Sequence, residues 1–506
     1  MAKTKTTKVL QFMGSKWFWR ITLGFFIFEA LWIALSSQYP MAFDEDFHFG
    51  LIKLYANQWL PFFSHAPSNA AAFGGVTQDP SYLYHYLMSF PYRLISIFTN
   101  DQTVIIILLR LLNIALAAMS LVLFRRLLRR VGTGKVTTNI VMAVFVLIPV
   151  TPLLAGQINY DNLLLLCVAV FCLLIERIIA STKANKLPLG TILVTLAFGL
   201  LSSLVKYAFL PILAASGVFV LWYLWRHWKR DWSTFRRALS ASWHGLTSLK
   251  QFGLIALLLL SIGLFSQRYV VNVVVYHSLI PDCGKVLDNE ACQQYGPWNR
   301  DFSLSQNKSD NDESSPVVYM AEWLYGMWYR LFFVIKGGFA PDVYQNFPPL
   351  PVIGVGAISL FIFGIAAFIA TFKRVMRDNH SYVYFLAICI VYVAILWLQN
   401  YGAFLRTGQP VAINGRYLLP ILLLIGAILA KSVALLLRKV SVVRSALAVL
   451  VLLLFLEGGG LVGFIVRSND AWYWRNDMVR SVNHAADNLL SPLVAGSQSS
   501  LPIPNP

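Results

Sequence analysis

Charged residues are scarce in this chain. Asp, Glu, Lys and Arg make up 13% of its 506 residues, whereas soluble domains carry about 25%. So few charges cannot cover the surface of a soluble protein, which excludes a soluble enzyme. Hydrophobic residues account for 57% of the sequence and aromatic residues for 14%, and this richness excludes a disordered chain. The composition therefore predicts a membrane protein that crosses the bilayer several times.

Acidic residues are rarer than basic residues in this chain. Lys and Arg number 41 against 23 Asp and Glu, which gives a net charge of +18. Membrane proteins collect basic residues in their cytoplasmic loops, so this excess does not require an acidic partner. The sequence also lacks the residue spacings of zinc fingers and recognition helices. We therefore expect the lipid bilayer, and no nucleic acid, as a partner.

Eleven segments have the length and apolar character of a membrane-spanning helix, which needs about 20 residues. The boundary between the fifth and sixth is the least distinct, because Lys206 and Pro211 interrupt one long apolar run. No small-residue cleavage site follows the first segment, so we expect it to remain as an anchor. The predicted spans are 17–38, 103–124, 137–155, 162–180, 188–204, 207–225, 251–276, 350–371, 382–399, 416–436 and 444–466.

The basic residues gather on one side of these predicted spans. If the N-terminus faces the cytoplasm, so do the RRLLRR run at 125–130 and most other basic clusters. The positive-inside rule therefore predicts a multi-pass protein of the cell membrane with a cytoplasmic N-terminus and an external C-terminus. Three external regions, 39–102, 277–349 and 467–506, are then long enough to build a site. We expect residues 1–466 to form one transmembrane domain, followed by an external helix and tail.

The external regions carry further structural signals. Apolar residues at helical spacing predict amphipathic helices over 47–59 and 81–98, and an aromatic-rich helix over 317–335. The tail after about residue 490 is polar and rich in Ser and Pro, which predicts disorder.

Cysteine is rare, with five residues in the whole chain. Cys283 and Cys292 share one predicted external loop, where an oxidising environment permits a disulfide. Two thiols without a nearby His or further Cys make a poor tetrahedral zinc site, so we predict a disulfide between them.

Three consecutive carboxylates, Asp44, Glu45 and Asp46, follow the first span at its predicted outer end. Like charges this close raise the pKa of at least one group, which suits a general base or a cation site. The alternative is that the acids cap the N-terminus of the amphipathic helix and favour its dipole. The composition of the segment alone favours the capping interpretation slightly.

Five short motifs give the chain a resemblance to known enzymes. Their layout resembles the GT-C superfamily of multipass glycosyltransferases, which includes protein O-mannosyltransferases and lipid A aminoarabinose transferases. A closer similarity is to uncharacterised bacterial multipass proteins predicted to be GT-C-like, over about 40–215 and 400–425. The resemblance implies an all-helical polytopic membrane fold with external juxtamembrane helices. The motifs are DEDFH (44–48), DPSYLYHYL (79–87), INYDNL (158–163), VKYAFLP (205–211) and NGRYLLP (414–420).

The resemblance also implies a reaction. Such enzymes transfer a sugar from a polyprenyl-phosphate donor with inversion, using one carboxylate that takes a proton from the acceptor hydroxyl. This role falls on Asp44 or its neighbour Glu45, and Asp46 is an additional acid that leaves the choice open. His48 could bind a divalent cation with Asp44, or it could simply form hydrogen bonds on the helix surface. We therefore assign no certain cofactor or metal ligand and leave a divalent cation open.

Substrate-binding candidates follow from the charge of the donor phosphate. Arg416, at the predicted outer start of the tenth span, could grip a phosphate with two hydrogen bonds, and Tyr417 adjoins it. Lys206 lies in an interrupted span, and such breaks usually line a cavity. Snorkelling and interfacial anchoring are the alternatives for both cations. Asp161 could bind the sugar or acceptor or cap a helix, and Asp79 completes the set.

Two charges are predicted to lie within the membrane. Glu29 and Arg110 are at similar depths in the first two spans, and an unpaired charge there is costly, so we expect them to form an ion pair. Arg110 also matches the arginine that begins this span in the mannosyltransferases. It could therefore orient the catalytic carboxylate instead.

The sequence thus predicts an integral membrane glycosyltransferase with its active site at the outer face. Its expected partners are a polyprenyl-phosphate-linked sugar and an unknown glycan, lipid or protein acceptor. One alternative is a transporter or flippase of a lipid-linked glycan, although the sequence shows neither the repeat nor the paired broken helices typical of transporters. The other is a non-catalytic protein of envelope assembly that uses the acidic loop as a binding surface.

Overall fold

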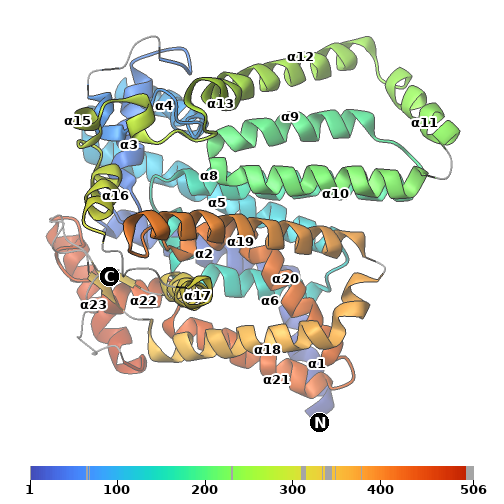
Figure 1. Ribbon diagram of the computed structural model, residues 1–506. Coiled ribbons are helices and arrows are strands. Elements are labelled where there is room, and N and C mark those ends of the chain that lie inside the picture. Colours follow the sequence, from blue (N-terminus) through green and yellow to red (C-terminus); the bar gives the residue numbers. More distant parts are fainter. Residues whose placement is uncertain are drawn as a thin grey trace.

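Long helices run side by side through the protein (Figure 1). The structure is a computed structural model that describes residues 2–63, 67, 69–229, 232–308, 315–332, 334–336, 345–347, 349–377 and 379–496. The first half contains α1 (Ala2–Met13), α2 (Lys16–Ser36), α3 (Glu45–Ala56), η1 (Ala70–Phe73), α4 (Leu83–Ser96), α5 (Gln102–Arg130), α6 (Lys135–Leu147), α7 (Val150–Ala155), α8 (Tyr160–Lys183), α9 (Leu189–Val205), η2 (Tyr207–Phe209), α10 (Leu210–Trp228) and α11 (Trp232–His244).

The second half is built in the same way, with one pair of short strands. Its elements are α12 (Ser248–Phe265), η3 (Ser266–Val270), α13 (Val271–Tyr276), α14 (Cys283–Val286), α15 (Asn289–Cys292), α16 (Gly296–Gln306), α17 (Pro316–Phe332), β1 (Val334–Lys336), β2 (Gln345–Phe347), α18 (Pro351–Met376), α19 (His380–Thr407), η5 (Gly415–Leu418), α20 (Leu419–Leu436), α21 (Ser441–Gly458), α22 (Gly460–Arg467), α23 (Asp477–Leu490) and η6 (Ser491–Leu493).

Within the described residues, nine helical segments are long and apolar enough to cross a membrane. They coincide with nine of the eleven predicted spans, and the remaining two, α6 and α9, are apolar but shorter than 18 residues. The architecture is therefore that of a polytopic membrane protein. The nine are Lys16–Ser36, Gln102–Arg130, Tyr160–Lys183, Tyr207–Trp228, Ser248–Tyr276, Pro351–Met376, His380–Thr407, Gly415–Leu436 and Ser441–Arg467.

Several spans are interrupted near residues that disfavour a continuous helix. The third predicted span divides into α6 and α7 at Pro149, since proline cannot donate a backbone hydrogen bond. The predicted break at Lys206 is confirmed, because α9 ends at Val205 and Lys206 itself is extended. A third break lies at Gly459, between α21 and α22. Each break leaves backbone groups that side chains can approach.

Buried Glu29 uses the third of these breaks. Its Oε1 accepts a hydrogen bond of 2.9 Å from the backbone N–H of Leu461, in the first turn of α22. Gly460, which begins this helix, has a φ of +53°, and a side chain there would meet the Glu29 carboxylate. The predicted ion pair between Glu29 and Arg110 is therefore wrong. The partner of Glu29 is the N-terminus of a helix, where the backbone dipole favours negative charge.

The predicted amphipathic helices over 47–59 and 81–98 are confirmed as α3 and α4, which pack against each other. Arg93 of α4 donates hydrogen bonds to the last carbonyls of α3, including those of Tyr55 (2.8 Å) and Ala56 (2.9 Å). A cation at the C-terminus of a helix satisfies carbonyl groups that the helix itself leaves free. This contact fixes the relative positions of the two helices.

The short helices α14, α15 and α16 form a layer, linked by a disulfide, beside α3 and its neighbours. Cys283 and Cys292 are bonded with an S–S distance of 2.07 Å, which confirms the predicted disulfide. The three other cysteines, Cys167, Cys172 and Cys389, are buried and reduced. Tyr295 of this layer stacks near Phe47 of α3, with 5.9 Å between the ring centroids.

The C-terminal segment closes the end of α2. The backbone N–H of Gln38 donates to the carbonyl of Trp472 (2.9 Å), and Ser37 forms an isolated bridge with Tyr473. Farther along, the helix predicted over 317–335 is confirmed as α17, except that residues 334–336 form β1 and pair antiparallel with β2. The predicted disordered tail has a short helical turn at Ser491–Leu493, and its residues 497–506 lie outside the described part of the chain.

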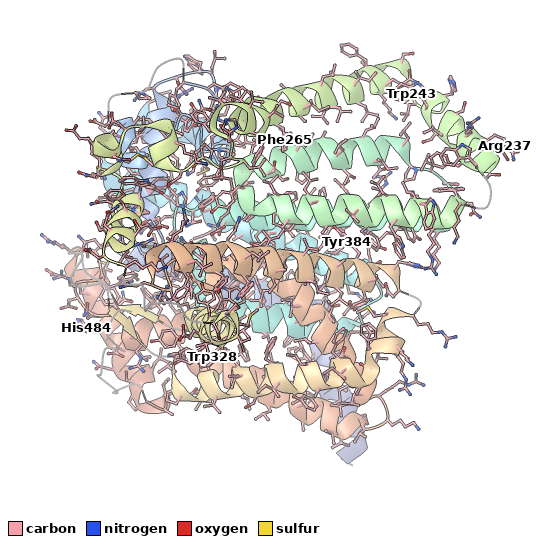
Figure 2. The ribbon with its side chains drawn as sticks, viewed as in Figure 1. Arg237, Trp243, Phe265, Trp328, Tyr384 and His484 are labelled. Carbon is pink, nitrogen blue, oxygen red and sulfur yellow. A yellow bond between two sulfur atoms is a disulfide. The ribbon has the colours of Figure 1, made fainter. Side chains whose placement is uncertain are left out.

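The two ends of the helix bundle differ in character. Helices α3, α4, α15 and α16 gather at one end, which we call the site end, and α11 lies at the other, which we call the basic end (Figure 1). Figure 2 shows Arg237 and Trp243 of α11 at the basic end, far from His484 of α23 at the site end. This separation agrees with the predicted division of loops, and which end faces the cytoplasm stays a prediction.

Candidate active site

The acidic motif lies between α2 and α3, in an unusual backbone conformation. Phe43 and Asp44 both have a φ of +68°, in the left-handed region that residues other than glycine seldom occupy. Such positions cost about 1–3 kcal/mol each and persist where neighbouring groups hold them. The turn directs two adjacent carboxylates, Asp44 and Glu45, into different surroundings.

Glu45 is fully buried and its carboxylate is saturated with hydrogen bonds. Oε1 accepts from Arg110 Nε (2.8 Å) and from the backbone N–H of Ile158 (3.1 Å). Oε2 accepts from Arg110 Nη2 (2.7 Å) and from the backbone N–H of Met41 (2.8 Å). This carboxylate has no lone pair directed toward an approaching substrate, and its geometry is that of a structural anchor.

Arg110 completes this anchor from α5. It is fully buried, and besides Glu45 its Nη1 donates to the carbonyls of Ala34 (2.8 Å) and Ser37 (2.7 Å) at the end of α2. One guanidinium thereby joins α2, α5 and the start of α3. The sequence offered two partners for Arg110, namely Glu29 and a carboxylate of the acidic motif. In the structure Arg110 pairs with the acidic motif, through Glu45.

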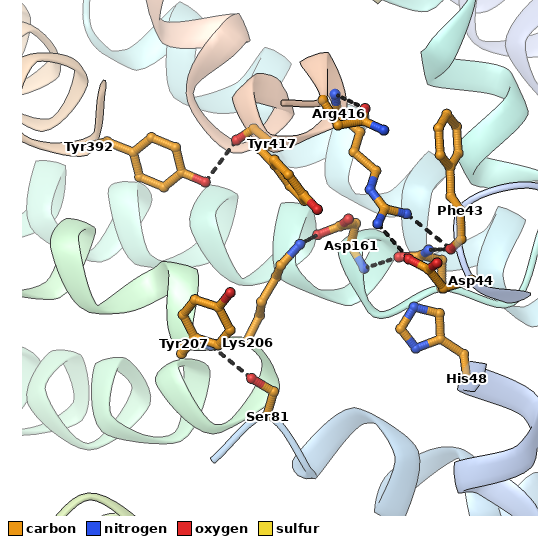
Figure 3. Close-up of polar contacts among 12 residues, drawn as sticks. Phe43, Asp44, His48, Ser81, Asp161, Lys206, Tyr207, Tyr392, Arg416 and Tyr417 are labelled. Atoms are coloured by element: carbon orange, nitrogen blue, oxygen red, sulfur yellow. Dashed lines mark hydrogen bonds and ion pairs between the residues drawn. The ribbon is translucent and has the colours of Figure 1, made fainter. Parts of the chain in front are cut away.

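Asp44, in contrast, exposes 58% of its side chain. Its Oδ2 accepts a hydrogen bond of 2.7 Å from Nη2 of Arg416, a buried residue of η5 (Figure 3). Nη1 of the same guanidinium donates to the carbonyl of Phe43 (3.0 Å), which also accepts from the side chain of Asn159 (3.0 Å). These contacts hold the left-handed turn. They leave most of the Asp44 carboxylate accessible.

Lys206 and Asp161 form a second buried ion pair beside Asp44. Lys206 Nζ lies 2.6 Å from Asp161 Oδ1, and each side chain is 4% exposed. The ammonium also faces the rings of Tyr160 (4.3 Å to the centroid) and Tyr417 (5.1 Å). The extended residue between α9 and η2 is therefore what brings this cation to the site, as Figure 3 shows.

Two buried histidines adjoin the acidic motif. His48 Nδ1 and His85 Nε2 are 2.9 Å apart, and the other nitrogen of each ring has no hydrogen-bond partner in the described part of the chain. Burial lowers the pKa of His48 well below its usual value and that of His85 to about 3. Both imidazoles are therefore neutral near pH 7. Within the described residues, no three His, Cys, Asp or Glu side chains converge as metal ligands.

Asp79 and Asp46 take separate positions. Asp79 Oδ1 accepts from the backbone N–H of Ser81 (2.8 Å), and the Ser81 hydroxyl accepts in turn from the N–H of Tyr207 (3.1 Å). Burial raises the pKa of Asp79. Asp46 is exposed in the first turn of α3. The side chain of the N-cap residue, Asp44, makes no capping hydrogen bond, so capping does not account for the acidic cluster.

The structure thus brings together Asp44, His48, Asp161, Lys206, Arg416 and Tyr417, and it sets Glu45 and Arg110 behind them as an anchor. Sequence reasoning missed His85 and gave no separate role to Asn159. Both lie in motifs that the sequence analysis quoted, 79–87 and 158–163, and that grouping was the available signal. Among the described residues, buried polar atoms at the site without a hydrogen-bond partner include Arg416 Nε, Asp161 Oδ2, His48 Nε2 and His85 Nδ1.

The chemistry available here follows from the charges. A solvent-accessible carboxylate can accept a proton, and two neighbouring buried cations can stabilise an anionic leaving group. The chain matches no known protein family, and no curated protein matches it. The resemblance to GT-C glycosyltransferases therefore stays a prediction, and any functional conclusion depends on this geometry.

Proposed function

We propose that the protein is a membrane glycosyltransferase that moves a sugar from a polyprenyl-phosphate donor to an acceptor hydroxyl with inversion. The observation that carries the proposal is the exposed carboxylate of Asp44, held 2.7 Å from the guanidinium of buried Arg416. The proposed base, Asp44, and the proposed phosphate-binding cation, Arg416, are thereby in direct contact. Glycosyl transfer from a phosphate donor needs both groups close to the anomeric carbon.

The proposed reaction is a single displacement. Asp44 takes the proton of the acceptor hydroxyl while the acceptor oxygen forms a bond to the anomeric carbon. The bond between that carbon and the phosphate oxygen breaks, and the polyprenyl phosphate leaves with the electron pair. Arg416 and Lys206 stabilise the negative charge that develops on the phosphate, and Asp44 becomes the protonated acid.

Unpartnered polar atoms support substrate binding at this place. Arg416 Nε, Asp161 Oδ2 and His48 Nε2 are buried without hydrogen bonds among the described residues. A buried polar atom left without a partner costs about 1–3 kcal/mol, so a ligand that satisfies these atoms recovers that free energy. Phosphate oxygens suit Arg416, and sugar hydroxyls, which both donate and accept, suit Asp161 and His48.

The test is complementation of a deletion strain, with lipid-linked sugars measured by mass spectrometry. We expect the deletion to accumulate a polyprenyl-phosphate sugar and the wild-type gene to remove it. Asp44→Asn should lower turnover by about 10²–10⁴, the contribution of a positioned acid–base group. Asp46→Asn, an exposed acid two residues away, is the matched control and should clear the lipid normally. A strain with Asp44→Asn that clears the lipid at wild-type rate would contradict the proposal.

A second candidate is transport of a lipid-linked glycan, because interrupted helices at membrane depth are typical of transporters. The breaks at Pro149, Lys206 and Gly459 favour it. A transporter moves the lipid-linked sugar without cleaving the glycosyl–phosphate bond. Purified protein in vesicles that contain the accumulated lipid, with a cell-envelope extract as the source of the acceptor hydroxyl, distinguishes the two, because only the transferase releases polyprenyl phosphate.

A further inference from the structure

Another buried cation, Arg268, lies away from Asp44 and has no role in the proposed reaction. Arg268 belongs to η3, a π-helical turn between α12 and α13, and its residue is 1% exposed. Its neighbours Val270, Val271 and Val274 are 37–67% exposed on the outer surface of the same span. Single π-helical turns inside α-helices occur frequently at functional sites. Here the turn points a guanidinium inward from a lipid-facing helix.

The guanidinium of Arg268 is held by aromatic rings, and no carboxylate of the described residues lies within ion-pair distance of it. Its Cζ lies 4.6 Å from the centroid of Phe62 and 5.0 Å from that of Tyr82. Nη1 donates to the side chain of Gln267 (2.5 Å), while Nε and Nη2 have no hydrogen-bond partner of good geometry among the residues that the structure describes. Snorkelling does not explain this position, because a snorkelling arginine places its charged group in water.

Other polar groups around Arg268 also lack partners. Among the described residues, the buried hydroxyl of Tyr82 has no hydrogen-bond partner, and the buried hydroxyl of Tyr55 lies close enough to the guanidinium to interact with it. Asp79 is the acid that interacts with Arg268, yet burial raises its pKa and thereby weakens it as a counterion. A buried cation whose guanidinium donors are not fully satisfied thus lies beside two tyrosine hydroxyls. Their desolvation is costly unless an anion joins them.

We infer that Arg268, Tyr55 and Tyr82 form a binding site for a phosphate group carried by a membrane lipid. Nε and Nη2 are the two donors on one edge of the guanidinium, which is the fork that grips phosphate with two parallel hydrogen bonds. The two tyrosine hydroxyls supply further donors for the remaining phosphate oxygens. The exposed valines beside Arg268 place the entry at the membrane, so the phosphate comes attached to a hydrocarbon chain.

This inference does not rest on the proposed function, because binding can be measured without transfer. The experiment is equilibrium binding of radiolabelled farnesyl phosphate to the full chain in an uncharged detergent. It uses the Arg416→Gln background, which removes the phosphate contact expected beside Asp44. Farnesol and inorganic phosphate serve as competitors, and they separate the lipid source from free phosphate.

We expect Arg268→Gln to weaken farnesyl phosphate binding about 10- to 100-fold, as the loss of charge-assisted hydrogen bonds implies. Arg268→Lys should restore part of the affinity, since lysine keeps the charge but loses the fork. Tyr82→Phe, which removes only a hydroxyl, should weaken binding by a smaller factor and keeps the inference testable if the arginine variants fail to fold.

Three results would overturn the inference. Binding that is unchanged in both Arg268→Gln and Tyr82→Phe places the phosphate elsewhere. If farnesol competes as strongly as farnesyl phosphate, the site recognises the hydrocarbon part of the ligand and not its phosphate. Competition by inorganic phosphate at equal concentration shows a site for free phosphate and refutes the lipid source. Loss of transfer in Asp44→Asn has no bearing on any of these outcomes.

Discussion

Adjacent acids Asp44 and Glu45 should respond in opposite ways to the same chemical change. Replacing either carboxylate by the amide conserves its size and removes its charge. Glu45→Gln leaves Arg110 buried without a counterion and turns an amide N–H₂ toward groups that also donate. Asp44→Asn changes an exposed carboxylate whose guanidinium partner keeps its contact with a backbone carbonyl. We expect the first variant to lose stability and the second to lose turnover.

The size of the stability loss follows from the contacts of Glu45. Its four hydrogen bonds, at 2.7–3.1 Å, come from Arg110 and two backbone N–H groups, and both side chains are fully buried. Removing one partner of a buried ion pair costs about 3–5 kcal/mol. Asp46→Asn is the control, since an exposed acid in the first turn of a helix contributes about 0.3–1 kcal/mol.

The assay is equilibrium unfolding in mixed detergent micelles, followed by tryptophan fluorescence, beside the turnover of each variant. The double variant Glu45→Gln with Arg110→Met should be destabilised by less than the sum of the single changes, because the two residues interact directly. One result refutes the reasoning. If Glu45→Gln unfolds like the wild type but loses turnover as Asp44→Asn is expected to, Glu45 is the base and Asp44 is not.

Three further predictions concern other parts of the chain. Because burial lowers the pKa of His48 and His85 in the folded state, folding stability should fall as pH decreases below about 6.5, and the unfolding midpoint of His85→Gln should depend less on pH between 6.5 and 4.5. Mass spectrometry after alkylation without reduction should find Cys283 unmodified and bonded; modification by alkylating reagent before reduction would contradict this. Single cysteines introduced at Arg237 and His484 should differ in intact cells, with only the one at His484 reached by a membrane-impermeant maleimide; the reverse pattern would invert the topology.

Much of the fold could be predicted from hydropathy, because membrane-spanning helices require long apolar segments. The break at Lys206 could also be predicted, since a charge and a proline interrupt an apolar run. The break at Pro149 was missed, although its proline is visible, because the surrounding residues are uniformly apolar. Residues 334 and 335 were assigned to a helix because their neighbours are aromatic and apolar, but they belong to a short strand that pairs with residues 345–347. Apolar periodicity does not reveal such a pairing.

The sequence predicted which residues belong to the candidate site, but it did not predict which charged residues pair with one another. Depth in the membrane suggested that Glu29 and Arg110 interact, but depth says nothing about which helix faces which. Arg110 instead meets Glu45, because the loop after α2 folds back into the bundle. The role of Arg268 escaped notice because a single arginine in a span carries no motif. Only its burial and unpartnered donors distinguish it.

The bond between Arg416 and Asp44 also sets the order of events during synthesis. Arg416 follows Asp44 by 372 residues, so the ribosome completes most of the spans before the guanidinium exists. A chain still being inserted carries the acidic motif without the donor that holds the turn at Phe43. The carboxylate of Asp44 is therefore fixed in place only when the late span Gly415–Leu436 has joined the bundle. Incomplete or truncated chains consequently lack the contact between Arg416 and Asp44 and the turn that it holds.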